Sequence, residues 1–97
     1  MSDTDLQLSL MKLLSTKHFP LQKPRRSVKL EFLVKLLAKL KCETEKVAVF
    51  ENLNELKGRG LANTDPKILM KDEIDIAEFQ IWLTPLGRSE LHKSLAG

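Results

Sequence analysis

At 97 residues the chain is long enough for one folded domain and too short for two of ordinary size. A hydrophobic fraction of 42% allows a real core and excludes a chain that is disordered throughout. Aromatic residues make up only 5% of the chain, so Leu, Ile and Val must supply most of the packing. Cys42 is the single cysteine, which excludes an intramolecular disulfide and favours a buried, reduced thiol.

Several function classes find little support in the sequence. Cys42, His18 and His92 make a poor zinc set, and there is no glycine-rich phosphate loop or supported Ser-His-Asp set. We therefore expect no enzyme activity, no metal and no cofactor. The acidic start is unlike a secretory signal, and no stretch approaches the roughly 20 apolar residues of a membrane span. These features predict a cytoplasmic protein that does not bind membranes.

The charges are unevenly distributed along the chain. Residues 1–41 contain nine Lys and Arg against three Asp and Glu, whereas residues 42–97 contain seven against ten. The first half is therefore basic and the second half mildly acidic, although the formal net charge is +3.

The first predicted element is a helix over residues 4–16. Thr4 and Gln7 have capping-box spacing. Apolar residues then recur at helical spacing, namely Leu6, Leu10, Leu13 and Leu14. If these four serve the domain's own core, Leu8 and Met11 remain for a partner helix, which raises the hypothesis of a homodimer.

A second helix is predicted over residues 27–41, with Ser27 as its N-cap. Its apolar stripe consists of Phe32, Leu33, Leu36, Leu37 and Leu40. Lys35 and Lys39 lie on the opposite side, which favours a domain helix with a solvated lysine face.

A third helix is predicted over residues 44–57. Its buried seam consists of Val49, Leu53 and Leu56, and Phe50 at the border of this seam is assigned to the core. Gly58 and Gly60 end the helix, since glycine readily adopts the left-handed C-cap conformation. The segment 62–66 has the composition of a turn.

The period then changes to two, which predicts a hairpin over residues 67–83. Ile68 and Met70 alternate in its first strand, Asp72 and Glu73 form an acidic tip, and the second strand ends at Leu83. Thr84 and Pro85 are typical of an N-cap followed by a first helical residue, so a last helix is predicted over residues 85–95.

Two segments resemble winged helix-turn-helix proteins of the MarR and PadR type. Leu53-Asn54-Glu55-Leu56-Lys57-Gly58-Arg59-Gly60-Leu61 is similar to the end of their third helix, and Trp82-Leu83-Thr84-Pro85-Leu86-Gly87-Arg88 is similar to the Leu-Thr-x-x-Gly-Arg segment that ends their wing. The resemblance implies a single α+β, mostly helical winged-helix domain over residues 1–97. It also implies double-stranded DNA as the partner and a role in transcription regulation, with the third helix in the major groove and the hairpin against the backbone.

The candidate DNA contacts come from the third helix and the wing and, separately, from the basic segment before and at the start of the second helix, which could itself hold DNA. They are Lys23, Arg25, Arg26, Lys29, Lys46, Val47, Asn54, Lys57, Lys67 and Lys71. The outward face of the third helix and the wing tip are nevertheless acidic. The alternative function is a protein-interaction module that docks a basic partner through Glu51, Glu55, Asp72, Glu73 and Asp75. The sequence leaves both functions open.

Overall fold

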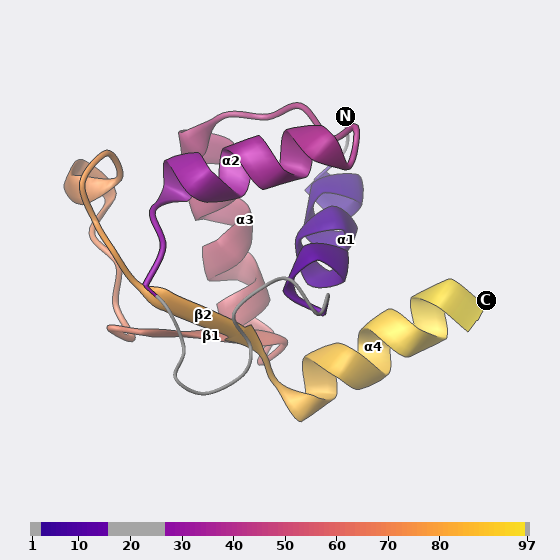
Figure 1. Ribbon diagram of the computed structural model, residues 1–97. Helices are drawn as coiled ribbons and strands as arrows, with labels where there is room; N and C mark the ends of the chain where they lie inside the picture. The colour runs from indigo at the N-terminus through magenta and orange to yellow at the C-terminus, as the bar shows by residue number, and fades with distance from the viewer. Residues whose placement is uncertain (1–2, 16–26, 97) are drawn as a thin grey trace.

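The computed structural model describes residues 3–15 and 27–96. Within these residues the fold is α+β and mostly helical, with four α-helices and one two-stranded antiparallel sheet (Figure 1). The elements in chain order are α1 (Asp3–Leu14), α2 (Leu30–Lys39), α3 (Lys46–Gly58), β1 (Ala62–Asp65), the short 3-10 helix η1 (Lys71–Glu73), β2 (Gln80–Leu83) and α4 (Pro85–Ala96).

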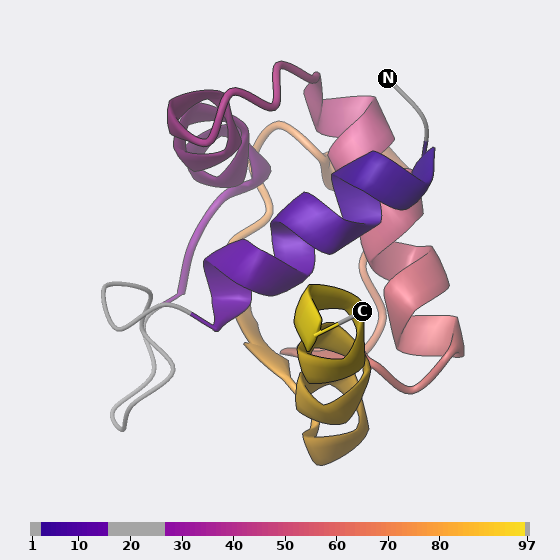
Figure 2. The same ribbon diagram turned by 90° about the vertical axis from the view of Figure 1, so that its right-hand side faces the viewer.

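Helices α1, α2 and α3 pack against one another, and the sheet closes one end of this group (Figures 1 and 2). Helix α4 leaves the sheet after β2 and packs against α1. No helix in the described part of the chain is long and apolar enough to cross a membrane.

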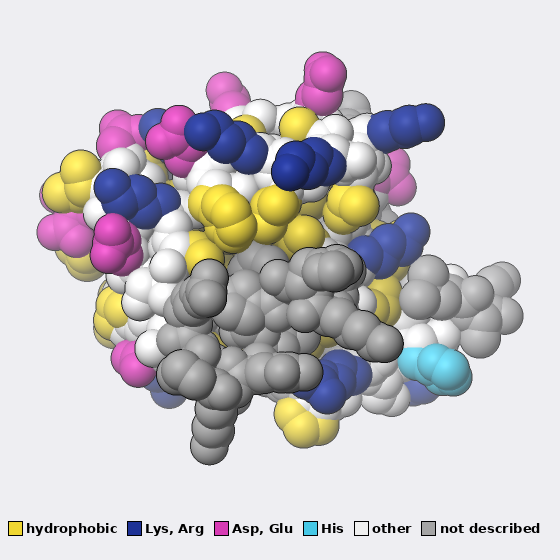
Figure 3. Space-filling view, viewed as in Figure 1, with side chains coloured by type: hydrophobic (Ala, Val, Ile, Leu, Met, Phe, Trp, Pro, Cys, Tyr) yellow, Lys and Arg dark blue, Asp and Glu magenta, His cyan; other side chains and the backbone are white. Residues whose placement is uncertain are grey.

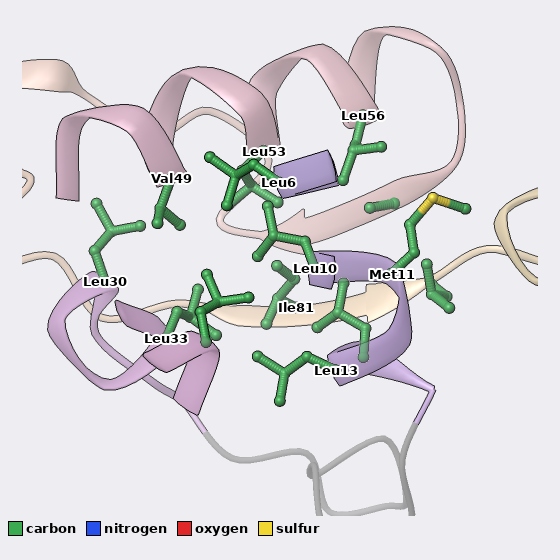
Figure 4. Close-up of a cluster of buried hydrophobic side chains, with 14 of the residues drawn as sticks. Leu6, Leu10, Met11, Leu13, Leu30, Leu33, Val49, Leu53, Leu56 and Ile81 are labelled. Atoms are coloured by element: carbon green, nitrogen blue, oxygen red, sulfur yellow. The ribbon is translucent and has the colours of Figure 1, made fainter. Parts of the chain in front are cut away.

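The core is built mainly from aliphatic side chains of the three packed helices and β2 (Figure 4). The predicted seam of Val49, Leu53 and Leu56 is fully buried, and so is the predicted apolar face of α1. Met11 also lies in this core at 6% exposure. The prediction that Met11 remains free for a partner helix is therefore wrong, because the broad apolar face of α1 includes it.

The first strand of the sheet lies earlier in the chain than predicted. Residues 62–65 pair with residues 80–83, and Ala62 and Thr64 face the core opposite Leu83 and Ile81. The assignment of 62–66 to a turn was wrong, and so was the placement of the first strand from residue 67 onward. The hydroxyl of Thr64 donates to the carbonyl of Pro66 at 2.8 Å, so this polar side chain is buried without an unpaired donor.

A short extended segment precedes α2. Val28 forms an antiparallel bridge with Phe79, in which each residue's N–H donates to the other's carbonyl at 2.8 and 3.0 Å. This bridge holds residues 27–29 out of the helix, so Lys29 rather than Ser27 is the N-cap residue.

The apolar stripe of α2 differs from the prediction at Leu30, Phe32 and Leu40, and Leu36 is only partly buried. Leu30, Leu33 and Leu37 are the buried positions of this helix, whereas Phe32 is 43% exposed and Leu40, just after the helix, is 45% exposed. The helix starts at Leu30, and Leu30 rather than Phe32 faces the core.

The remaining helix ends test four predictions. Gly60 adopts a positive φ of 74° just after α3, as predicted for a C-cap glycine. The N-cap of α3 is Glu45, so the helix starts two residues later than predicted. The Thr84 hydroxyl accepts the N–H of Gly87 at 3.0 Å, which confirms the predicted N-cap of α4. The capping-box prediction for Gln7 is wrong, because its side chain is buried against α3.

Candidate functional site

The connection between β1 and β2, residues 66–79, lies along α3. Polar contacts join the two segments within the described residues at the following pairs: Lys57 Nζ with the Lys67 carbonyl, Lys71 Nζ with Glu51 Oε1 at 4.0 Å, and Lys46 Nζ with Asp75 Oδ1 at 2.6 Å. The α3 numbers fall as the connection numbers rise, so the connection runs antiparallel to α3 over most of its length. The predicted recognition helix and the predicted wing therefore form one continuous surface.

Lys46 is held at the start of α3 by a carboxylate of the connection. The hydrogen bond to Asp75 raises the pKa of Lys46 above its usual value, and the negative charges of Asp75 and Glu31 add to this effect, while partial burial opposes it. Helix α2, which carries Glu31, packs against α3, and the connection contacts the start of α3 through Asp75.

Lys57 occupies the other end of α3. Its amine donates to the carbonyl of Lys67, and burial, followed by the nearby charge of Lys67, lowers its pKa below the usual value. Lys46, Lys57 and Lys71 were predicted to contact DNA. In the structure each of them contacts a partner within the protein.

The other predicted DNA contacts fall into three places. Lys23, Arg25 and Arg26 lie outside the described residues. Lys29 is exposed at the start of α2, well separated in sequence from α3. Val47 and Asn54 are exposed on α3, and Lys67 is exposed on the connection, so these three lie on the continuous surface.

The acidic surface, made of Glu51, Glu55, Asp72, Glu73 and Asp75, is exposed on α3 and the connection. Residues 66–79 contain four carboxylates against two lysines. Glu51 and Asp75 take part in the ion pairs between α3 and the connection, and Asp72 and Glu73 follow Lys71 in the chain, whereas Glu55 lines a pocket beside α1 and α4.

Sequence reasoning missed the exposed apolar residues of the connection. Ile68 is 76% exposed, Met70 is 53% exposed and Ile76 is 71% exposed. Their alternation predicts a strand at Ile68 and Met70, which the structure does not contain. The available signal was Pro66, because proline cannot donate a ladder hydrogen bond and commonly ends a strand.

A second surface, of opposite charge, follows the outward side of α2. This basic surface is made of Lys29, Lys35, Lys39 and Lys41, with the exposed apolar side chains of Phe32 and Leu40 among them. Glu31 is its one carboxylate between residues 29 and 41, and it pairs with Lys35 at 3.8 Å. Figure 3 shows lysines above apolar side chains over α2, with acidic and apolar side chains beside them over the connection.

Sequence reasoning also missed a polar chain between α1 and α3. Arg59 donates to Oε1 of the buried Gln7 at 2.9 Å, Gln7 donates to Oδ1 of the buried Asn52 at 3.0 Å, and Asn52 donates to the Ala48 carbonyl at 2.8 Å. Gln7 and Arg59 also line an open pocket of about 320 Å³ between α1, α3 and α4. Glu55 and Glu90 share this pocket, so its charge is mixed.

Comparisons with known proteins gave no match. No protein-family model matches the sequence, no curated protein is significantly similar to it, and no solved structure matches the fold significantly.

Proposed function

We propose that the chain is a winged-helix domain that binds a basic protein partner through α3 and the β1–β2 connection. The order of elements supports the winged-helix fold, since α2 and α3 form a helix-turn-helix pair and the hairpin follows α3. Val28 lies in the chain between α1 and α2. Its bridge with Phe79 would extend the sheet by the short third strand of a winged helix. The connection is then the wing.

The observation that carries the functional proposal is the contact between α3 and the connection. It pairs Lys46, Lys57 and Lys71 with groups of the protein itself, while Glu55, Asp72 and Glu73 are exposed. DNA binding depends on lysines and arginines that neutralise phosphates. Carboxylates beside a recognition helix repel those phosphates and instead suit a basic protein.

The exposed apolar residues of the connection support the same proposal. Ile68, Met70 and Ile76 lie within one short acidic segment, at exposures of 76%, 53% and 71%. Apolar residues at the centre of a polar rim are the usual composition of a protein interface. A partner with both apolar and basic side chains would match this surface.

DNA binding is the second candidate, and the basic surface of α2 is the observation that favours it. Lys29 stands at the N-terminus of α2 and Lys35 and Lys39 follow on its outward side. Such a row of lysines could bind phosphates without sequence specificity. In that case α2 rather than α3 would contact the duplex.

Amide chemical shifts of the ¹⁵N-labelled protein test both candidates. An amphipathic helical peptide of Leu and Lys is the basic probe, and the same peptide with Gln in place of Lys is its control. The proposal expects shifts confined to α3 and residues 66–79 with the Lys peptide, weaker binding by Asp72→Asn/Glu73→Gln, and no response to the control peptide.

A mixed-sequence DNA duplex, measured by fluorescence anisotropy at about 50 and 200 mM salt, is the competing probe. Steeply salt-dependent binding of the duplex, with amide shifts along α2 or α3 and none from the Lys peptide, would overturn the proposal. Absence of duplex binding together with the expected peptide shifts would support it.

A further inference from the structure

We propose that the basic partner is the α2 surface of a second copy of this chain, so that the protein forms a dimer with twofold symmetry. This inference rests on the proposed function, because it assigns an occupant to the same acidic surface. In the dimer, the basic surface of each copy lies on the acidic surface and connection of the other.

The chemistry of the two surfaces is complementary. Phe32 and Leu40 are exposed among the four lysines of the basic surface. Ile68, Met70 and Ile76 are exposed among the carboxylates of the connection. Each surface therefore offers apolar side chains to bury and charges of the sign that the other needs. One protein thus supplies both halves of the interface that the proposed function requires.

The positions of the two surfaces favour a closed dimer over an open chain of molecules. Helix α2 packs against α3, and Lys46 at the start of α3 bonds Asp75 of the connection, so α2 and the connection both border α3. Figure 3 shows the acidic side chains over the connection beside the lysines over α2, whereas α3 lies behind α2 in this view. Adjacent complementary patches allow a twofold axis to form both contacts at once.

Charge exchange tests the dimer. One variant carries Lys35→Glu and Lys39→Glu, and the other carries Asp72→Lys and Glu73→Lys; all four residues are exposed. Sedimentation equilibrium measures the mass of each protein between roughly 10 and 300 μM. Thermal melting by circular dichroism verifies that each variant is folded.

The wild-type chain is expected to approach the mass of a dimer over this range and to dissociate as salt rises. Each variant alone opposes like charges at both contacts, and we expect at least about tenfold weaker association. An equimolar mixture of the two variants restores opposite charges at both contacts. The mixture is therefore expected to regain the wild-type association.

The pattern of the results separates the two proposals. A wild-type chain that stays monomeric, or variants that associate as well as the wild type, would overturn the dimer. If the chain is monomeric and the Leu/Lys peptide still shifts α3 and residues 66–79, the proposed function holds with a different partner. If the peptide also fails, both proposals fall.

Discussion

Gly87 lies where α4 approaches the turn before β1, and replacing it with alanine should strongly destabilise the fold. A Cβ at this position would lie 1.9 Å from the Leu61 carbonyl oxygen and 2.9 Å from its carbon. Ordinary contact with the oxygen requires at least about 1.5 Å more, so α4 or Leu61 must move. Backbone atoms cannot rotate away as a flexible side chain could.

The magnitude follows from what this movement would break. Thr84 N donates to the Leu61 carbonyl at 3.1 Å, and the Thr84 hydroxyl donates to the Gly60 carbonyl at 2.5 Å. Two hydrogen bonds contribute roughly 2 kcal/mol, and overpacking costs roughly 1–3 kcal/mol more. The higher helix propensity of alanine returns at most about 1 kcal/mol. We expect Gly87→Ala to lower the free energy of unfolding by about 3 kcal/mol.

Urea denaturation followed by circular dichroism measures this change, and for a domain of this size the same loss lowers Tm by roughly 12–24 °C. Gly58→Ala is the matched control, because a Cβ added there, at the end of α3, would have no other atom within 4 Å. This control should be neutral or stabilising by about 0.5 kcal/mol. A Gly87→Ala protein as stable as the control would refute the steric reasoning.

Three further predictions concern buried and paired groups. Gln7→Leu should lower the free energy of unfolding by about 1–3 kcal/mol because Asn52 Oδ1 loses its buried donor, and adding Asn52→Leu should recover part of that loss in a double-mutant cycle by urea denaturation. Asp75→Asn should lower the pKa of Lys46 toward its usual value, which NMR titration of the side chain measures. The stabilisation from this pair is present below pH 10.5 and is lost as pH rises through the raised pKa of Lys46. Equal stability of the wild type and the variant across alkaline pH would contradict the pairing. Cys42 is 2% exposed, so a thiol reagent should modify the native protein far more slowly than the protein in urea, and equal rates would contradict its burial.

Helical spacing predicted the parts of the fold that depend on neighbouring turns of one helix. The leucines of α1 and the seam of α3 recur every three or four residues, and they are buried as predicted. The C-cap at Gly60 and the N-cap at Thr84 were also predictable, because each depends on the local conformation of a few residues.

The remaining features depend on partners distant in the chain. Strand β1 contains Asn63 and Asp65, which favour turns, and only its pairing with β2 makes it a strand. The start of α2 depends on the bridge between Val28 and Phe79. The candidate surface was predicted by its charges alone. The lysines of this surface contact the connection because the chain folds back along α3, as the pair of Lys46 and Asp75 shows. No local sequence pattern encodes such a contact.

The hydrogen bond between Gln7 and Asn52 has a consequence for how α1 finds its place in the fold. If α1 slid by one turn, Leu10 could take the place of Leu6 and Leu14 that of Leu10, so at these two positions the leucines alone would not distinguish the registers. Sliding would also leave the amide of Asn52 buried without the donor that Gln7 supplies at 3.0 Å, at a cost of about 1–3 kcal/mol. One polar pair in an apolar interface thus adds to the leucine packing in selecting a single register for α1.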